Sequence, residues 1–303
     1  MAATKQKKGH NAGPLAVSNT ANVIICIILG LFCLSCVLPV LLVYTTSFTD
    51  ELAITKNGVS LFPETFSFEA YRMLFGTSGA KILTSYRNTI LITVLGTVFG
   101  LWFMTMYAYA CSRKDFKFRQ FLSFYAYFTM LFSGGMIPAY LNVRDLGMMD
   151  TLLALIMPNA INTSNLLIMR SAFMSVPESL SEAAEIDGAS HRQILFQVMV
   201  PLVKATMAVL VLYYGVAHWN SWFNASIYLR SSDKFPLQLV LRNILIEGET
   251  SDMLSDVGSA DNPQAVQLLK YSLIVVSTLP IMCIYPFLQR FFEKGVMLGA
   301  VKG

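Results

Sequence analysis

The chain has 303 residues, of which 55% are hydrophobic and only 13% are charged, and its mean hydropathy is +0.56. Soluble domains carry roughly 25% charged residues, so this composition excludes an ordinary soluble protein and indicates a surface covered largely by lipid. The net charge of +4 does not indicate a nucleic-acid partner, because the basic residues flank apolar runs instead of forming one patch.

Six runs of the sequence contain no Asp, Glu, Lys or Arg and are long enough to cross a bilayer. About 20 helical residues span the roughly 30 Å hydrocarbon core, and only helical backbone satisfies its own polar groups there. We therefore predict an all-α, polytopic membrane protein. The expected transmembrane helices are residues 21–48, 88–110, 121–143, 151–169, 205–228 and 271–289.

The first run follows a lysine-rich stretch at 5–8, as the core of a cleaved signal peptide would, but it is far longer than such a core. We interpret it as a membrane helix. The glycine pair 134–135 and Pro158 interrupt later runs and favour kinks. Gly96 and Gly100, four residues apart, permit a close helix crossing, although the spacing also arises by chance.

The distribution of Lys and Arg predicts the orientation. With the N-terminus in the cytoplasm, 13 of the 22 basic residues lie on the cytoplasmic side, and both termini are cytoplasmic. The segments are then a cytoplasmic tail (1–20), the first helix, an external loop (49–87), a core domain (88–292) with a cytoplasmic loop (170–204) and an external loop (229–270), and a cytoplasmic tail (293–303). The acidic stretch 247–261 of the second external loop is expected to be mobile.

The apolar runs hold no strongly ionisable residue, whereas secondary transporters commonly keep coupling groups near the middle of the membrane. The sequence also lacks the Gly-x-x-x-x-Gly-Lys-Ser/Thr loop that cradles ATP phosphates. Its histidines, His10, His191 and His218, are scattered, which disfavours catalytic or metal chemistry. We predict a transporter that is not an enzyme and draws its energy from another protein. A self-sufficient secondary transporter or channel and an intramembrane enzyme are the alternatives.

The cytoplasmic loop contains the pattern of a short capped helix. Ser175 and Glu178 have capping-box spacing, Pro177 suits a first helical turn, and Gly188 ends the helix. The alanine pair 183–184 leaves a smooth face that can enter a cleft on another protein. An amphipathic helix lying on the membrane surface is the alternative interpretation.

The same loop carries a recognisable signature. Glu182-Ala183-Ala184 is followed after three residues by Gly188 and after nine more by a segment that ends in Pro201. This pattern resembles the EAA motif of bacterial ABC importer permeases. The family pattern ends in Ile-x-Leu-Pro, so Val198 and Val200 are conservative departures from it.

The resemblance covers nearly the whole chain. Asn88-Thr89 at the start of the second run, Pro177-Glu178 before the motif and the terminal segment 295–303 are similar to the carbohydrate-importer branch. Within that branch the chain resembles the maltose-type second permease, in the group for polysaccharide or complex-sugar uptake. A permease of the same fold for a non-sugar solute is the alternative.

The resemblance implies a type I ABC importer permease fold of the MetI-like class in a bacterial cytoplasmic membrane. It implies a heterodimer with a different permease, two copies of a cytoplasmic ATPase and an extracytoplasmic solute-binding protein. ATP would bind to the ATPase, and this chain would bind no cofactor, metal or nucleic acid. By the resemblance, the residues that couple to the ATPase are Glu182, Ala183, Ala184, Asp187, Gly188, Ala189 and Pro201, and those of a tail contact are Gly295, Gly299 and Lys302.

For the sugar pathway, the fifth run and its outer end combine flat aromatic faces with amide groups, and sugars use both. The candidates are Tyr213, Tyr214, Trp219, Asn220, Trp222 and Asn224. Trp and Tyr also collect at membrane interfaces as anchors, which is the alternative reading. In maltose-type systems the partner permease can hold most of the substrate.

Overall fold

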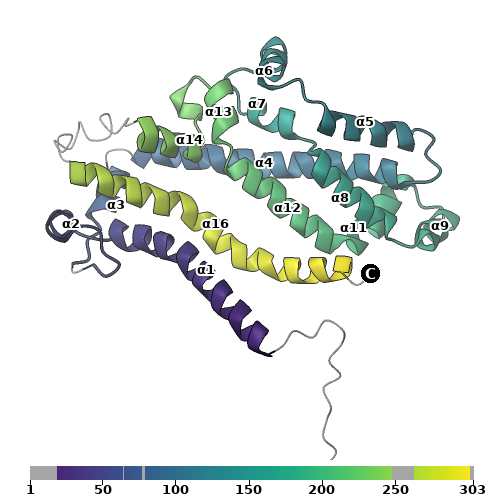
Figure 1. Ribbon diagram of the computed structural model, residues 1–303. Helices are drawn as coiled ribbons and strands as arrows, with labels where there is room; N and C mark the ends of the chain where they lie inside the picture. Colours follow the sequence, from purple (N-terminus) through teal and green to yellow (C-terminus); the bar gives the residue numbers. More distant parts are fainter. Residues whose placement is uncertain (1–18, 64, 77–78, 248–262, 301–303) are drawn as a thin grey trace, which may run out of the picture.

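A computed structural model describes the chain at residues 19–63, 65–76, 79–247 and 263–300. These residues form an elongated bundle of helices (Figure 1). Most of the N-terminal tail, Lys302 and nearly all of the acidic stretch expected to be mobile lie outside the described residues.

Helices account for the architecture, and the described residues hold no strand beyond an isolated antiparallel bridge between Thr49 and Phe66. The α-helices are α1 (Asn19–Ser47), α2 (Glu51–Asn57), α3 (Glu69–Gly76), α4 (Gly79–Ser112), α5 (Arg119–Leu131), α6 (Met136–Asp145), α7 (Leu153–Ile156), α8 (Thr163–Met174), α9 (Glu178–Ile186), α10 (His191–Gln193), α11 (Val200–Leu202), α12 (Lys204–Trp219), α13 (Trp222–Tyr228), α14 (Leu237–Arg242) and α16 (Pro263–Ala300). Short 3₁₀ turns η1 (Met157–Asn159) and η3 (Ser232–Lys234) and π-helical turns η2 (Ile194–Met199) and η4 (Asn243–Glu247) complete the list.

Helix α4 is the axis of the bundle. Its 34 residues extend about 50 Å, and Figure 1 shows α8 and α12 alongside it. Ile92 and Met104 of α4 are fully buried, the first against α7 and α13 and the second against α8 and α12. Because α4 is apolar along most of its length, it can bury side chains against the partners around it.

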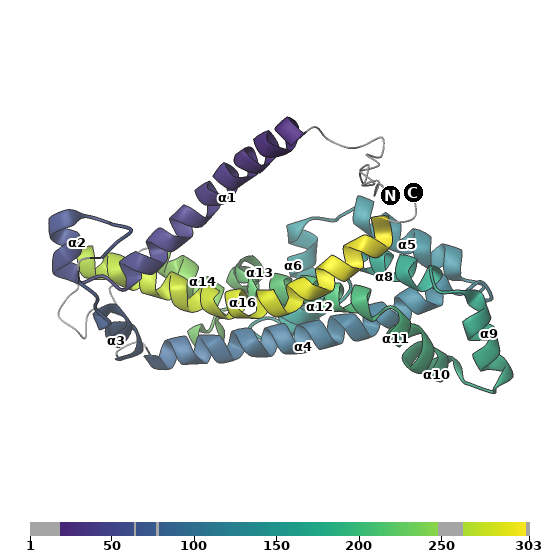
Figure 2. The same ribbon diagram turned by 90° about the horizontal axis from the view of Figure 1, so that it is seen from below.

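Helices α1 and α16 form the outer side of the bundle. α16 packs on α12 and α3, and α1 contacts the bundle chiefly through α16. Near this contact the Tyr44 hydroxyl donates a hydrogen bond to Met282 Sδ at 3.0 Å. Figure 2 shows the N-terminal half of α1 leaning away from the other helices, and its apolar side chains, such as Leu31 and Phe32, are exposed. A run this apolar and this exposed suits a lipid environment.

The long helices only partly match the six expected spans. Among the described residues, three helices are long and apolar enough to cross a membrane, at 20–47, 79–112 and 266–286. Two bent pairs raise the number to five: α5 with α6, bent by 117°, and 191–202 with α12, bent by 88°.

The expected continuous helix at 121–143 is broken. α5 ends at Leu131 and α6 begins at Met136, with the Gly134-Gly135 pair between them. Gly135 has φ of +84°, in the left-handed region that an L side chain disfavours. The glycine pair thus produces a sharp turn where we expected at most a kink.

The expected helix at 151–169 consists of three pieces, α7, η1 and α8. Pro158 lies in the 3₁₀ turn, and α8 begins only at Thr163. The Asn162 side chain caps α8 by accepting a hydrogen bond from Asn165 N at 3.1 Å. A proline, which lacks an N–H, followed by a good N-cap residue favours two helices over one. The run at 205–228 is likewise divided, into α12 and α13.

An aspartate ties two loops together at the end of the bundle remote from α9. Asp150 has φ of +56°, and its N–H donates to Tyr228 O at 2.8 Å. Its carboxylate accepts bonds from the N–H groups of Arg230 and Ser231 at 3.0 Å, from the Ser231 hydroxyl at 2.6 Å and from Lys234 Nζ at 2.8 Å. The hydrogen bonds from Lys234 and Ser231 hold the pKa of this carboxyl well below its usual range.

The start of the second apolar run anchors the same region. Asn88 Nδ2 donates a hydrogen bond to Asp233 O at 2.7 Å, and Thr89 Oγ1 accepts one from Leu237 N at 2.8 Å. Both side chains are buried. These contacts give the Asn88-Thr89 pair a structural role, which is to hold the η3–α14 segment against α4.

Replacing Asp150 by asparagine is expected to loosen the loop at Arg230 and Ser231. Because the folded pKa of Asp150 is lowered, its stabilising effect is complete above the ordinary pKa of about 4 and is lost as the pH falls through the lowered value. Hydrogen exchange of this loop, corrected for intrinsic rates, should therefore be faster at neutral pH in Asp150→Asn and should no longer accelerate on acidification. Asp145→Asn is the matched control. Equal exchange in the three proteins contradicts the prediction.

Candidate functional site

The helix in the 170–204 loop begins differently from the expectation. α9 starts at Glu178 with Pro177 as its N-cap residue and has no side-chain cap, so the capping box predicted for Ser175 and Glu178 is wrong. Ser175 ends α8 instead, and its hydroxyl donates to Ala172 O at 2.7 Å. The reason is that α8 continues to Met174, which brings Ser175 into the wrong helix for capping α9.

The predicted end of this helix is confirmed. Gly188 has φ of +81°, its N–H donates to Glu185 O at 3.0 Å, and the N–H of Ala189 donates to Ala184 O at 2.9 Å. These two bonds form a Schellman motif, which places a left-handed residue just after the helix and favours glycine there. Apart from residue 188 and its two chain neighbours, no heavy atom of the described chain lies within 4 Å of the point where a Cβ of residue 188 would be.

One side of α9 faces the bundle and the other faces outward. Ser181 is buried, with its hydroxyl 3.6 Å from Met199 Sδ, and Ala184 packs against the core formed by α4, α8 and α12. Glu182 and Ala183 are exposed, and Ile186 is 86% exposed. The outward side of α9 therefore presents an acidic, a small and an apolar side chain at the surface.

Ion pairs fasten α9 to the turn between α4 and α5. Arg113 binds Glu185 of α9, and Lys114 binds Glu178. Arg113 also donates from Nε to Asp115 Oδ1 at 3.0 Å, and this bond holds the pKa of the Asp115 carboxyl below its usual range. A displacement of α9 is thereby linked to the end of α4, the axis of the bundle.

Beyond α9 the chain turns back into the bundle through α10, η2 and α11. Ser190 and Gln193 form the capping box of α10. Pro201 lies at the start of α11 directly after a π-helical stretch, and the chain then bends by 88° into α12. Because proline has no N–H to donate, it disturbs the regular helical ladder at this bend.

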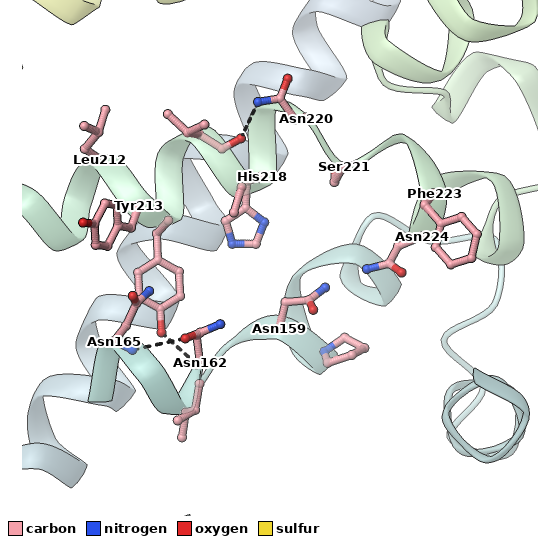
Figure 3. A pocket seen from close by; sticks show the side chains of 15 residues that line it. Asn159, Asn162, Asn165, Leu212, Tyr213, His218, Asn220, Ser221, Phe223 and Asn224 are labelled. Carbon is pink, nitrogen blue, oxygen red and sulfur yellow. Dashed lines mark hydrogen bonds between the residues drawn. The ribbon is translucent and has the colours of Figure 1, made fainter. Parts of the chain in front are cut away.

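A cavity of about 780 Å³ lies between α8 and the C-terminal end of α12. None of its lining residues is Asp, Glu, Lys or Arg; the wall is made of amides, hydroxyls, aromatic rings and aliphatic groups. Figure 3 shows asparagines of the η1–α8 break on one side and His218 on the other. The polar and aromatic members are Asn159, Asn162, Asn165, Tyr213, Tyr214, His218, Asn220, Ser221, Phe223 and Asn224.

Tyr214 connects the two walls of this cavity. Its hydroxyl accepts a hydrogen bond from Asn162 N at 3.0 Å and donates one to Ala160 O at 3.2 Å. These backbone groups belong to the break between η1 and α8, where no helical partner satisfies them. Non-helical backbone at membrane depth requires such partners, so Tyr214 stabilises the opening that the asparagines line.

Two glycines of α4 allow α12 to approach closely. A Cβ at Gly96 would lie 2.6 Å from Nε2 of His218, and one at Gly100 would lie 2.7 Å from Cε1 of Tyr214 and 2.9 Å from Ala160 O. All three distances are too short for a side chain. The two glycines therefore permit the close packing of α12 against α4.

Residues 106–298 match the family described as "Binding-protein-dependent transport system inner membrane component". This chain belongs to that family. The matched residues extend from the last turns of α4 to the last turn of α16 and include both the α9 loop and the cavity.

Relatives match this permease over nearly its whole length. It is 42% identical to the polygalacturonan/rhamnogalacturonan transport system permease protein YtcP of Bacillus subtilis over 90% of this chain and 95% of that one. It is 40% identical to protein LplC of the same organism, over 88% and 90%. The structure of a bacterial ABC transporter involved in the import of the acidic polysaccharide alginate superposes with a TM-score of 0.84, at 33% identity, over 91% of this chain and 99% of that one.

The structure brings together four of the six pathway residues predicted for this permease. Tyr213, Tyr214, Asn220 and Asn224 line the cavity. The other two, both tryptophans, do not. Trp219 is buried, and its Nε1 donates to the Ser277 carbonyl of α16 at 3.3 Å; the ring of Trp222 lies 4.8 Å below the Arg242 guanidinium.

The sequence interpretation missed the opposite wall of the cavity. Asn159, Asn162 and Asn165 recur every third residue inside an apolar run, and His218 and Ser221 complete the lining. Amides spaced in this way are unusual in a membrane helix, where polar groups are costly unless they line a cavity. That spacing was the available signal.

The predicted tail contact lies at the end of α16. Gly295 and Gly299 belong to its last turns, and Lys302 lies outside the described residues. Figures 1 and 2 both place this end of α16 at the same end of the molecule as α9. The tail and the α9 loop can therefore meet one partner.

Proposed function

We propose that this permease forms half of the membrane pathway of an importer for a sugar or oligosaccharide, driven by ATP hydrolysis on a separate subunit. The cavity between α8 and α12 carries the proposal. Its amides, hydroxyls and aromatic faces match the hydroxyl groups and apolar faces of a sugar ring, and its lining lacks charge. The similarity to a polygalacturonan/rhamnogalacturonan permease and to a transporter involved in alginate import supports the same solute class.

The exposed side of α9 is the proposed contact with the ATPase. Glu182, Ala183, Asp187 and Gly188 lie at the surface there, next to the exposed Ile186. We propose that two ATPase copies bind ATP, that one of them receives α9, and that Pro201 and the bend into α12 transmit its displacement. The chain itself binds no cofactor and performs no catalysis in this scheme.

The remaining architecture follows from this assignment. We propose six spans with both termini in the cytoplasm of a bacterial cell, the broken 151–169 segment counting as one span because η1 and α8 line the cavity. A second, different permease supplies the other half of the pathway, and an extracytoplasmic binding protein delivers the solute. Alternating access then arises from rigid-body movement of the two halves when the ATPases close and open.

The first test is composition and activity of the complex purified in mild detergent from its native membrane. The proposal expects an ATPase and a second permease to remain bound, and ATP-dependent uptake of oligosaccharides after reconstitution. Recovery of this chain alone in an active form contradicts the ATP-driven assignment. Uptake of amino acids but of no saccharide in a solute panel contradicts the sugar assignment and favours a non-sugar permease of the same fold.

Within that complex, Asn224→Leu is expected to weaken uptake of the best oligosaccharide. The Asn224 amide lines the cavity and makes no hydrogen bond with any described residue, so its removal costs little internal structure. One lost hydrogen bond of ~1 kcal/mol raises the half-saturating concentration about fivefold. Ser226→Ala, in the same helix but outside the cavity, is the control. An unchanged uptake curve for Asn224→Leu excludes this residue from the pathway.

A further inference from the structure

A second hollow, of about 270 Å³, lies at the α9 end of the bundle. Its walls are the last turn of α4, the start of α5, the C-terminal part of α8 and the first turn of α9. It is separate from the asparagine-lined cavity, and the two hollows share no lining residue.

The lining of this hollow is strongly cationic. It includes Arg113, Lys114, Arg119 and Arg170 but only one carboxylate, that of Glu178. Glu178 is already paired with Lys114, and Arg113 is paired with Asp115 and Glu185, so the excess positive charge comes from Arg119 and Arg170. Like charges placed together in a hollow raise the local positive potential and attract an anion.

Two of these cations have no anionic partner in the part of the chain that the structure describes. Arg170 donates from Nε to Cys111 O at 3.3 Å but forms no ion pair there, and the Arg119 guanidinium forms neither a hydrogen bond nor an ion pair with a described residue. Both side chains are only partly exposed. Half-buried guanidinium groups are normally paired, and their planar forks suit phosphate oxygens.

The hollow lies between the ends of two apolar helices. α4 ends its apolar stretch at Ser112 and α5 begins the next one at Arg119. Large apolar side chains are exposed at and next to the hollow: Met174, which lines it, is 58% exposed, and Phe118, which directly precedes the lining residue Arg119, is 64% exposed. A charged hollow with an exposed apolar rim matches the two chemical parts of a phospholipid.

We propose that this hollow binds the phosphate of an anionic membrane lipid, with the acyl chains lying against Phe118 and Met174. Arg119 and Arg170 are the principal phosphate ligands, and Lys114 is a third. The shared chemistry is a phosphate group, and the apolar rim selects the lipid over a free phosphate ion. The inference requires only that α4 and α5 lie in a membrane, so it is independent of the solute that is transported.

Such a lipid would act on the α9 loop. Glu178 and Ser181 of α9 form one wall of the hollow, and Lys114 links Glu178 to the turn after α4. A bound phosphate therefore lies between α9 and the ends of α4, α5 and α8. Anionic lipid is then a component of the coupling between this loop and the bundle.

The test uses the complete transporter complex with Arg119→Gln and Arg170→Gln combined, and Lys117→Gln as a control that removes a charge from the same turn outside the hollow. The complexes are reconstituted in phosphatidylcholine nanodiscs with and without phosphatidylglycerol. Lipid retained after detergent purification is counted by native mass spectrometry, and ATPase activity is measured in both nanodiscs. Each basic residue near an anionic membrane surface contributes about a fivefold change in association, so the double variant should retain at least that much less phosphatidylglycerol.

The proposal expects the wild type and Lys117→Gln to retain phosphatidylglycerol and to change ATPase activity with it, and the double variant to lose both properties while remaining assembled. Equal retention in all three proteins overturns it. If inorganic phosphate added to phosphatidylcholine nanodiscs reproduces the effect of the lipid, the ligand is a free anion and the lipid assignment is wrong. If the double variant loses its ATPase subunits in both nanodiscs, the hollow is a protein contact, which also overturns the proposal.

Discussion

Replacing Gly188 by aspartate is expected to abolish ATP-driven uptake while leaving a folded permease in the membrane. The residue has φ of +81°, which costs most L residues ~1–2 kcal/mol and aspartate less, so the change in folding stability should be small. Nothing in the described chain lies within 4 Å of a Cβ at this position, so the new side chain meets no obstacle within the permease. Any large loss must come from a partner.

The partner contact is where the effect should arise. The new carboxylate would lie next to Asp187 in sequence, at the exposed end of α9 that we assign to the ATPase. A charge inserted into a protein interface without a partner costs several kcal/mol. If the substitution raises the activation barrier of the transport cycle by only ~3 kcal/mol, turnover falls about a hundredfold.

Gly147→Asp is the matched control, because Gly147 also has a left-handed backbone, with φ of +68°, and also lies in open space, in the connection between α6 and α7, away from α9 (Figure 1). Uptake, membrane content and ATPase co-purification are measured for both variants. Gly147→Asp should keep its uptake and lose as little stability as Gly188→Asp. Normal uptake by a well-expressed Gly188→Asp protein, or an equal loss in both variants, contradicts the coupling assignment.

The α9 loop shows what local sequence can and cannot specify. The end of α9 was predicted correctly because a Schellman motif depends on a glycine and on hydrogen bonds within six residues. The start was predicted wrongly because Ser175 belongs to α8, and the length of α8 depends on packing against α4 and α5. A capping pattern has meaning only when the preceding helix is known to have ended.

Breaks in membrane helices depend on distant residues. Pro158 and the Gly134-Gly135 pair were visible in the sequence, but whether each produces a kink or a break depends on what satisfies the freed backbone groups. Around Pro158 the partner is Tyr214, more than 50 residues later in the chain. Hydropathy detects an apolar run, but it does not show that the Tyr214 hydroxyl binds the backbone groups freed near Pro158.

Helical phase explains the error at the pathway residues. Consecutive residues of a helix point about 100° apart, so His218 faces Gly96 and the cavity, while Trp219 turns toward α16. The sequence interpretation selected aromatic and amide side chains by chemical type around the end of α12. Whether a residue at the end of α12 faces the cavity or α16 depends on how α12 packs against α4, which the sequence alone does not show.

Replacing Gly100 by alanine is expected to lower stability and uptake, because α4 packs closely against α12 at this residue. The added methyl group would lie 2.7 Å from the Tyr214 ring and 2.9 Å from the carbonyl oxygen of Ala160. The ring can move, but the carbonyl is backbone at the η1–α8 break and cannot yield without shifting α8. Overpacking of this kind costs ~1–3 kcal/mol.

A further loss follows at the cavity. If Tyr214 moves away from the methyl group, its hydroxyl leaves the backbone groups of Asn162 and Ala160, and each lost hydrogen bond costs about 1 kcal/mol. Gly100→Ala should therefore lower the thermal stability of the purified complex and reduce uptake severalfold. Tyr214→Phe, which removes only the hydroxyl, should reproduce the loss of the hydrogen bonds without the steric part.

Gly30→Ala provides the control for a glycine-to-alanine change in an apolar helix, because no heavy atom lies within 4 Å of a Cβ at Gly30. Alanine favours helix over glycine by up to ~1 kcal/mol, so this variant should be as stable as the wild type or more so. Thermal unfolding and uptake are measured for Gly100→Ala, Tyr214→Phe and Gly30→Ala. A Gly100→Ala protein as stable as Gly30→Ala would mean that α4 and α12 are separated further than the structure shows, and the cavity between α8 and α12 would then have a different shape.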